Sequence, residues 1–185
     1  MSDINHWGRE KSFVYVFPAA REFGNVADEL CKKSFLDAKH QLHPLLQNMG
    51  LEALEQRREF LGAFKSALEQ RVARRLAAWQ PAIQAVFRFD ETLMETNEAW
   101  DGSIHLLVKV SRLSEAVKWM SKTLDQSLVN SFKQFGWSRF QKRQSILDVQ
   151  QVTPNELRHG IGYGAMFYAV YTVPTQIWPQ GSQAK

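Results

Sequence analysis

The sequence contains one cysteine, Cys31, in 185 residues. A single cysteine excludes an intramolecular disulfide and any zinc site built from several thiolates. Long apolar runs are also missing, since no stretch approaches the about 20 consecutive apolar residues of a membrane-spanning helix. The first residues lack a basic region followed by an apolar one, so no secretory signal is expected. These absences predict a soluble, cytoplasmic protein with no membrane partner.

Signature motifs of the common enzyme classes are absent as well. The chain has no Gly-x-Ser-x-Gly elbow, no Gly-x-x-x-x-Gly-Lys-Ser/Thr loop, no Cys-x-x-Cys pair and no His-Glu-x-x-His helix. Asp37, His40 and His43 follow one another in steps of three, but no second run of this kind supplies further metal ligands. We therefore expect a binding protein rather than an enzyme, with no cofactor and no metal.

What the chain does have is enough apolar material for one domain spanning residues 1–185. Hydrophobic residues make up 44% of the sequence and aromatic residues 12%. Neither an internal repeat nor a linker divides it, so a single core is expected. Apolar residues recur at steps of three and four in three segments, which predicts helices over 27–45, 54–79 and 113–135. β-branched and aromatic residues predict five strands, at 12–17, 83–90, 103–110, 144–152 and 165–173.

The signals between these segments predict where the elements begin and end. Gly24 and Asn25 are expected to form a turn before the first helix, and Gly136 to follow the end of the third. Pro154 is expected to open a loop, and the tail from about residue 174 to be irregular. The resulting element order predicts an α+β fold, a ferredoxin-like βαββαβ sandwich. Its departures would be a helical hairpin in the first crossover and an added C-terminal strand.

Charge is unevenly distributed along the second half of the chain. The net charge is +4 overall, but 90–101 carries five acidic residues and no basic one, whereas 109–143 has a net charge of +6. Six bases also lie on the second predicted helix, at Arg57, Arg58, Lys65, Arg71, Arg74 and Arg75. At about 100° per residue they fall on both sides of its apolar stripe, so no single cationic face is expected there.

The acidic segment is the first candidate for a contact surface. Glu95, Glu98 and Asp101 surround Trp100, and an aromatic ring beside charges on a loop is typical of protein interfaces. A protein with a basic patch, or a second copy of this chain using its own basic segment, would be a matching partner. The alternative is an ordinary solvated hairpin loop.

The basic, aromatic segment 137–144 is the second candidate. It offers Arg139, Phe140, Lys142 and Arg143, and nucleic-acid binding needs cations for phosphates and flat rings for bases. The alternative is that Trp137 and Phe140 pack in the core and the bases are merely solvated. A third candidate is Arg158, His159 and Tyr163 around the glycines of 160–164, where an anion could bind. The alternative there is a hairpin connection or bulge.

These observations predict a non-enzymatic, macromolecule-binding domain, such as a protein-interaction, regulatory or assembly factor. Its expected contacts are Glu95, Glu98, Trp100, Asp101, Arg139 and Arg143. The alternative is RNA or single-stranded nucleic-acid binding through 137–144, with Arg158 adding a further cation. A homo-oligomer remains open, as does a small-ligand site or an enzyme built around Arg158, His159 and Tyr163.

Overall fold

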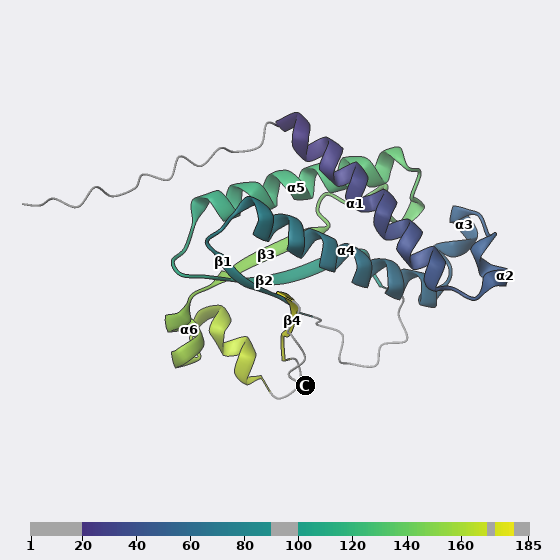
Figure 1. The fold of residues 1–185 in the computed structure, drawn as a ribbon. Helices are drawn as coiled ribbons and strands as arrows, with labels where there is room; N and C mark the ends of the chain where they lie inside the picture. Colours follow the sequence, from purple (N-terminus) through teal and green to yellow (C-terminus); the bar gives the residue numbers. More distant parts are fainter. Residues whose placement is uncertain (1–19, 90–99, 170–172, 180–185) are drawn as a thin grey trace, which may run out of the picture.

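The computed structural model describes residues 20–89, 100–169 and 173–179. Over these residues the chain is a mixed α+β fold built on a four-stranded sheet (Figure 1). The strands are β1 (Ile83–Arg88), β2 (Ile104–Val110), β3 (Leu147–Val152) and β4 (Thr175–Trp178). Their order in the sheet is β3-β2-β1-β4, so the α+β class is confirmed. The strand expected at 12–17 lies outside the described residues.

Strand pairing differs from the ferredoxin-like expectation. β1 pairs antiparallel with β2 and with β4, whereas β2 pairs in parallel with β3 from Ile104–Leu147 to Lys109–Val152. A ferredoxin-like sheet has split βαβ units, with another strand inserted between the two parallel ones. Here the two strands joined by α5 (Glu115–Gln134) are direct hydrogen-bonded neighbours. They form an unsplit βαβ unit, and the specific ferredoxin-like order is corrected accordingly.

Two long helices cover one face of the sheet, and a third lies across both (Figure 1). α4 (Arg58–Trp79) and α5 contact the strands, and α1 (Ala20–Gln41) packs on α4 and α5. Asp125 of α5 fixes this layer by accepting two hydrogen bonds of 2.7 Å, from the backbone N–H groups of Ile146 and Leu147. The largest fully buried side chains of the core are aromatic, namely Phe23, Phe60, Phe64, Phe132 and Phe140. Burial of each ring contributes about 2–3 kcal/mol.

The helix boundaries correct several sequence-based predictions. Gly24 and Asn25 form no turn, because α1 already begins at Ala20 and runs through both. This helix ends at Gln41, and the short α2 (Pro44–Gln47) starts separately with Pro44 at its first position. The short α3 (Leu51–Leu54) likewise precedes α4 instead of joining it. The predicted end of the third helix is confirmed: α5 stops at Gln134, and Gly136 follows with φ +74°.

The segment after β3 is helical, not a loop followed by a strand. Pro154 starts α6 (Pro154–His159), where Thr153 and Glu156 cap the helix reciprocally through their side chains. The strand expected over 165–173 is wrong as far as the structure describes it, since η2 (Gly162–Tyr168) is a 3-10 helix. Gly164 explains the fold-back: a Cβ there would lie 2.0 Å from the carbonyl oxygen of Glu156. Only glycine permits so close an approach.

η2 packs on the opposite face of the sheet. The C-terminal tail supplies the fourth strand. Phe167 meets Phe87 of β1 edge to face, with ring centroids 4.8 Å apart. The tail from 174 was expected to be irregular, yet it contains β4, in which Trp178 pairs with Val86 and Ile177 is buried. The added C-terminal strand therefore exists, but it lies at Thr175–Trp178.

Candidate functional site

The structure brings the acidic and basic segments together within one molecule. Arg143 Nη2 lies 3.0 Å from Oδ2 of Asp101, and Arg143 Nη1 donates to the hydroxyl of Ser103 at 3.2 Å. Arg139 Nη1 donates a 2.6 Å hydrogen bond to the carbonyl oxygen of Trp100. Four of the residues predicted to bind a partner are thus joined to each other. Glu95 and Glu98 lie outside the described residues, so their role stays a prediction.

Trp100 is part of this junction rather than a free interface residue. Its indole Nε1 donates to the carbonyl oxygen of Ser103 at 2.6 Å, and its ring is only partly exposed. The ring packs 5.9 Å from Phe64 and 5.7 Å from Phe140, measured between centroids. Trp100 therefore anchors the start of β2 to the aromatic core.

The charged groups of the junction are hydrogen-bonded, except that the buried Nε of Arg139 has no hydrogen-bond partner among the described residues. The largest single effect on the pKa of Asp101 is burial, which raises it. Hydrogen bonds from Ser103 and Arg143, together with the positive charge of Arg143, outweigh burial, so the pKa lies below its usual value. Glu55, which is 2% exposed, accepts a 2.8 Å hydrogen bond from the hydroxyl of Ser138. Arg139 also donates to the Glu55 carbonyl oxygen at 3.3 Å. These contacts serve the fold.

Phe140 is not available to stack on a nucleic-acid base. The ring is fully buried and lies 4.3 Å from the Phe132 ring, nearly parallel to it at 20°. Trp137 is 3% exposed and packs on the same cluster. The interpretation of these two aromatics as core residues is confirmed. Of the basic side chains in this segment, Lys142 is exposed, whereas Arg139 and Arg143 are half-buried in the junction.

The third predicted group is not assembled into a site. Arg158 and His159 lie in the last turn of α6 and Tyr163 in η2, and all three are exposed. Within the described part of the chain, no hydrogen bond or ion pair links them. The glycines between them form neither a hairpin connection nor a bulge, because Gly160 ends α6 in the left-handed conformation and Gly162 begins η2.

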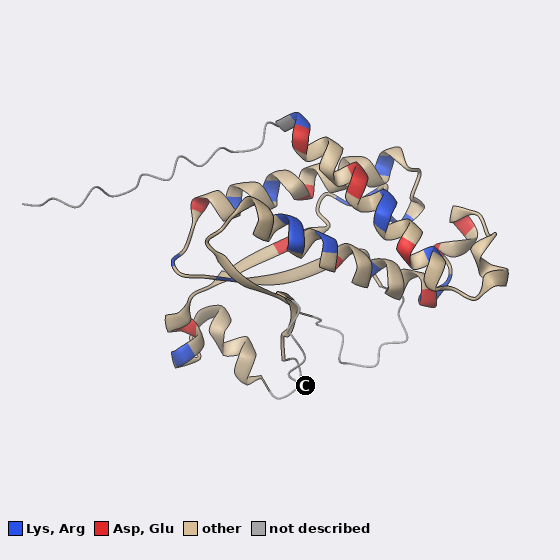
Figure 2. Ribbon diagram, in the orientation of Figure 1, with Lys and Arg blue, Asp and Glu red and all other residues tan. Residues whose placement is uncertain are grey.

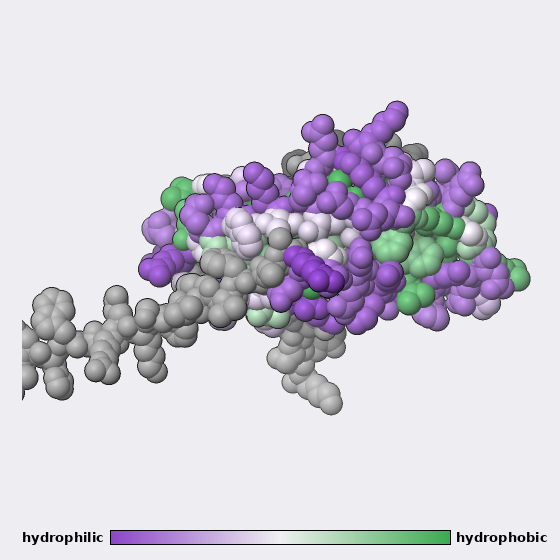
Figure 3. All heavy atoms as spheres, turned by 90° about the horizontal axis from the view of Figure 1, so that it is seen from above, coloured by the Kyte–Doolittle hydropathy of each residue, from purple (hydrophilic) through white to green (hydrophobic). Residues whose placement is uncertain are grey.

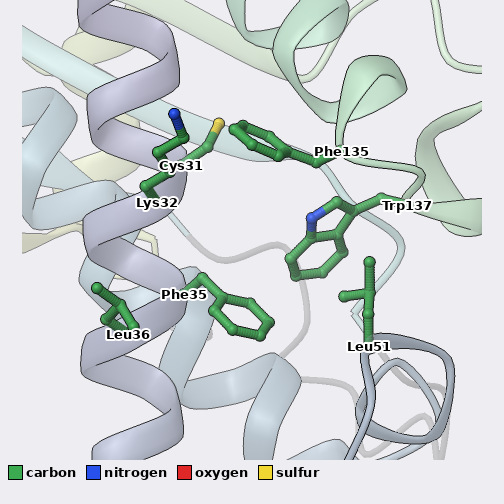
Figure 4. A pocket seen from close by; sticks show the side chains of 7 residues that line it. All are labelled: Cys31, Lys32, Phe35, Leu36, Leu51, Phe135 and Trp137. Atoms are coloured by element: carbon green, nitrogen blue, oxygen red, sulfur yellow. The ribbon is translucent and has the colours of Figure 1, made fainter.

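An apolar surface pocket, which sequence reasoning missed, lies between α1 and the chain after α5. It has a volume of about 340 Å³ and is lined by Cys31, Lys32, Phe35, Leu36, Leu51, Phe135 and Trp137. Figure 4 shows α1 side chains on one side of this hollow and Leu51, Phe135 and Trp137 on the other. We call it the α1 pocket. A sequence signal was present, since Leu36 follows Phe35 and broadens the apolar stripe of its helix.

Two lysines of α1 lie over aromatic rings that line the α1 pocket, and an exposed leucine lies beside them. Lys32 Nζ lies 5.3 Å from the centre of the Phe135 ring, and Lys39 Nζ lies 5.8 Å from that of Phe35. Leu36 leaves 52% of its surface exposed. Figure 3 shows apolar surface gathered over this end of the helical face, where the second half of α1 and α3 lie. The pocket thus combines an apolar floor with lysines at its mouth.

Cys31 lines the α1 pocket without being a reactive thiol. It is 2% exposed, and burial, helped by the nearby charge of Asp28, raises its pKa far above the ordinary value. A thiol that does not ionise is a poor nucleophile. No three His, Cys, Asp or Glu side chains among the described residues gather in a way that would hold a metal ion.

Comparisons of this chain with protein-family models, with curated proteins and with solved structures gave no match. None of the helices in the described part combines the length and hydropathy that crossing a bilayer requires.

Proposed function

We propose that this protein is a protein-binding domain that receives an amphipathic segment of its partner in the α1 pocket. The partner would place an aromatic or branched apolar side chain in the hollow and an acidic side chain beside Lys32 and Lys39. The observation that carries this proposal is an apolar surface pocket with lysines at its mouth. Its walls come from α1, from Leu51 of α3 and from the chain just after α5, and a pocket on packed elements is preorganised.

The energetics fit a moderate, specific interaction. Complete burial of one apolar side chain contributes about 1.5–3 kcal/mol, so the pocket acts as an anchor and needs surrounding contacts. Leu36 offers such a contact, because half of its surface is exposed at the pocket edge. Carboxylates near Lys32 and Lys39 would chiefly orient the segment and speed its association.

The α1 pocket supports this function better than the segment 137–144 supports RNA binding. Phe140 and Trp137 are buried, and the guanidinium groups of Arg139 and Arg143 bind carbonyl and carboxylate oxygens of the chain itself. Base stacking needs an accessible ring. Lys142 is the one exposed basic residue of segment 137–144, so an RNA-binding role of this segment would rest on it alone.

A peptide selection on the folded domain tests the proposal. Peptides from a displayed random library are selected on the immobilised protein, and the enriched peptides are then titrated against two variants. Leu36→Asp places a carboxylate at the pocket edge. The control Leu113→Asp makes the same change just before the N-terminus of α5, whereas the pocket lies beyond its C-terminus, and Leu113 is 66% exposed. Both positions are exposed, so both variants are expected to fold.

We expect enriched peptides to pair an apolar residue with Asp or Glu. Their affinity should fall at least about tenfold with Leu36→Asp and stay unchanged with Leu113→Asp. Equal binding to both variants, or enrichment of peptides without an apolar anchor, would contradict the assignment of the pocket.

A further inference from the structure

Four basic side chains from two helices surround a second hollow, on the other side of α1. This groove lies between α1 and α4, has a volume of about 280 Å³ and is lined by Glu29, Leu30, Lys33, Arg71, Arg74, Arg75 and Ala78. In Figure 2 the basic and acidic bands of α1 and α4 lie close together on the helical side of the molecule. We call it the α1–α4 groove. The bases of α4 were expected to spread over both sides of its stripe, but contact with α1 gathers three of them with Lys33.

Neighbouring groups hold three of these cations in place. Arg71 donates from Nε to Oδ2 of Asp37 at 3.1 Å, and its Nη2 binds the same oxygen. Arg75 Nη2 lies 3.5 Å from Glu29, and its guanidinium carbon lies 5.8 Å from the centre of the Trp79 ring. Lys33 Nζ lies 2.6 Å from the other oxygen of Glu29. Side chains that are already ordered lose less conformational entropy when they bind a ligand.

The groove retains an excess of positive charge. Lys33, Arg71, Arg74 and Arg75 are opposed by Glu29 and Asp37, which leaves two positive charges uncompensated. Arg74 is exposed and has no hydrogen bond or ion pair with any residue that the structure describes. It lines both the groove and a smaller adjoining hollow of about 110 Å³ formed with Gln41, Ser66 and Gln70. Its guanidinium is thus an available donor beside both hollows.

We infer that the α1–α4 groove binds a phosphate group, carried by a small ligand or as the free ion. A phosphate has about two negative charges near neutral pH and offers several acceptor oxygens, which matches the excess charge and the guanidinium donors. A ligand with a single carboxylate would leave one positive charge of the groove uncompensated. The inference is independent of the α1 pocket, because the two hollows share no lining residue.

Nuclear magnetic resonance of arginine side chains, at constant ionic strength, tests this inference. Inorganic phosphate and pyrophosphate are titrated separately into the full chain, with chloride as the reference anion. We expect saturable shifts of the Arg71, Arg74 and Arg75 Nε–Hε signals with phosphate but not with chloride. Tighter binding of pyrophosphate would indicate that a phosphate-bearing ligand, rather than the free ion, is the natural occupant.

Two matched variants separate the groove from general charge effects. Arg74→Ala should weaken phosphate binding about tenfold, because it removes the unpartnered donor. Arg158→Ala removes an exposed arginine from α6 and should leave binding unchanged. Equal effects of both variants would overturn the inference, as would linear, unsaturable shifts. Binding of a single-stranded RNA oligonucleotide without saturable phosphate binding would also overturn it, in favour of an RNA surface.

Discussion

Arg143 and Asp101, which are 42 residues apart in the chain, form an ion pair of 3.0 Å at the start of β2. The pair joins the acidic segment to the basic one, so part of the uneven charge along the sequence is compensated inside the molecule. The neighbouring contact from Arg139 to the Trp100 carbonyl oxygen reinforces the same junction. Trp100 and Asp101, which the sequence predicted to contact a partner, therefore make contacts within the fold itself.

The Asp101–Arg143 pair predicts a pH-dependent contribution to stability. Because the fold lowers the pKa of Asp101, its ionised form favours the folded state above the ordinary value of about 3.9. This contribution is lost as the pH falls through the lowered pKa. Asp101→Asn, which keeps an oxygen for the N–H of Ser103, should reduce the free energy of unfolding by up to about 1 kcal/mol near neutral pH. Urea unfolding should show this difference shrinking as the pH falls below the ordinary pKa of an aspartate, and a constant difference would contradict the explanation.

Arg139 is predicted to be a structural residue. Arg139→Ala removes the donors to the carbonyl oxygens of Trp100 and Glu55, and should lower the free energy of unfolding by about 2–3 kcal/mol. Lys142→Ala serves as the control in the same urea titration, since Lys142 is exposed, and should change stability by less than about 0.5 kcal/mol. Similar stability of the two variants would show that the junction does not support the fold.

Two glycines are predicted to respond in opposite directions to the same change. Gly102 has φ +100°, and an added Cβ would lie 2.7 Å from the buried Phe140 ring, so Gly102→Ala should cost about 1–3 kcal/mol. Gly62 lies inside α4 with open space around its Cα, so Gly62→Ala should stabilise the protein by about 0.5–1 kcal/mol. Thermal unfolding of the two variants beside the wild type measures both signs, and a shift in the same direction would be inconsistent with this packing.

The thiol of Cys31 should be inert in the folded protein. Burial raises its pKa, so the folded state holds the proton where an unfolded chain would release it above about pH 8.5. The free energy of unfolding should therefore fall as the pH rises beyond that value, and Cys31→Ala should remove this dependence. Ellman's reagent should label the folded protein far more slowly than the urea-unfolded chain. Rapid labelling of the folded protein would mean that the thiol is accessible through the α1 pocket.

Local sequence signals predicted the elements whose form depends on their own residues. Apolar periodicity indicated the long helices. The even-numbered Ile104, Leu106, Val108 and Val110, set against His105 and Lys109, indicated β2, and all four are buried. Gly136 was correctly placed after the third helix, because a residue with positive φ there suits glycine.

Tertiary contacts decided what these local signals could not. The apolar run 165–168 has β-forming residues, but the close approach of Gly164 to α6 makes it a 3-10 helix, and Phe167 then covers the sheet. Direct pairing of β2 with β3 likewise depends on contacts between distant segments. The α1 pocket and the α1–α4 groove each combine residues from helices that the chain brings together only on folding. The sequence by itself determined the apolar faces and the charged residues, whereas packing decided which of these were buried, paired or left open to a ligand.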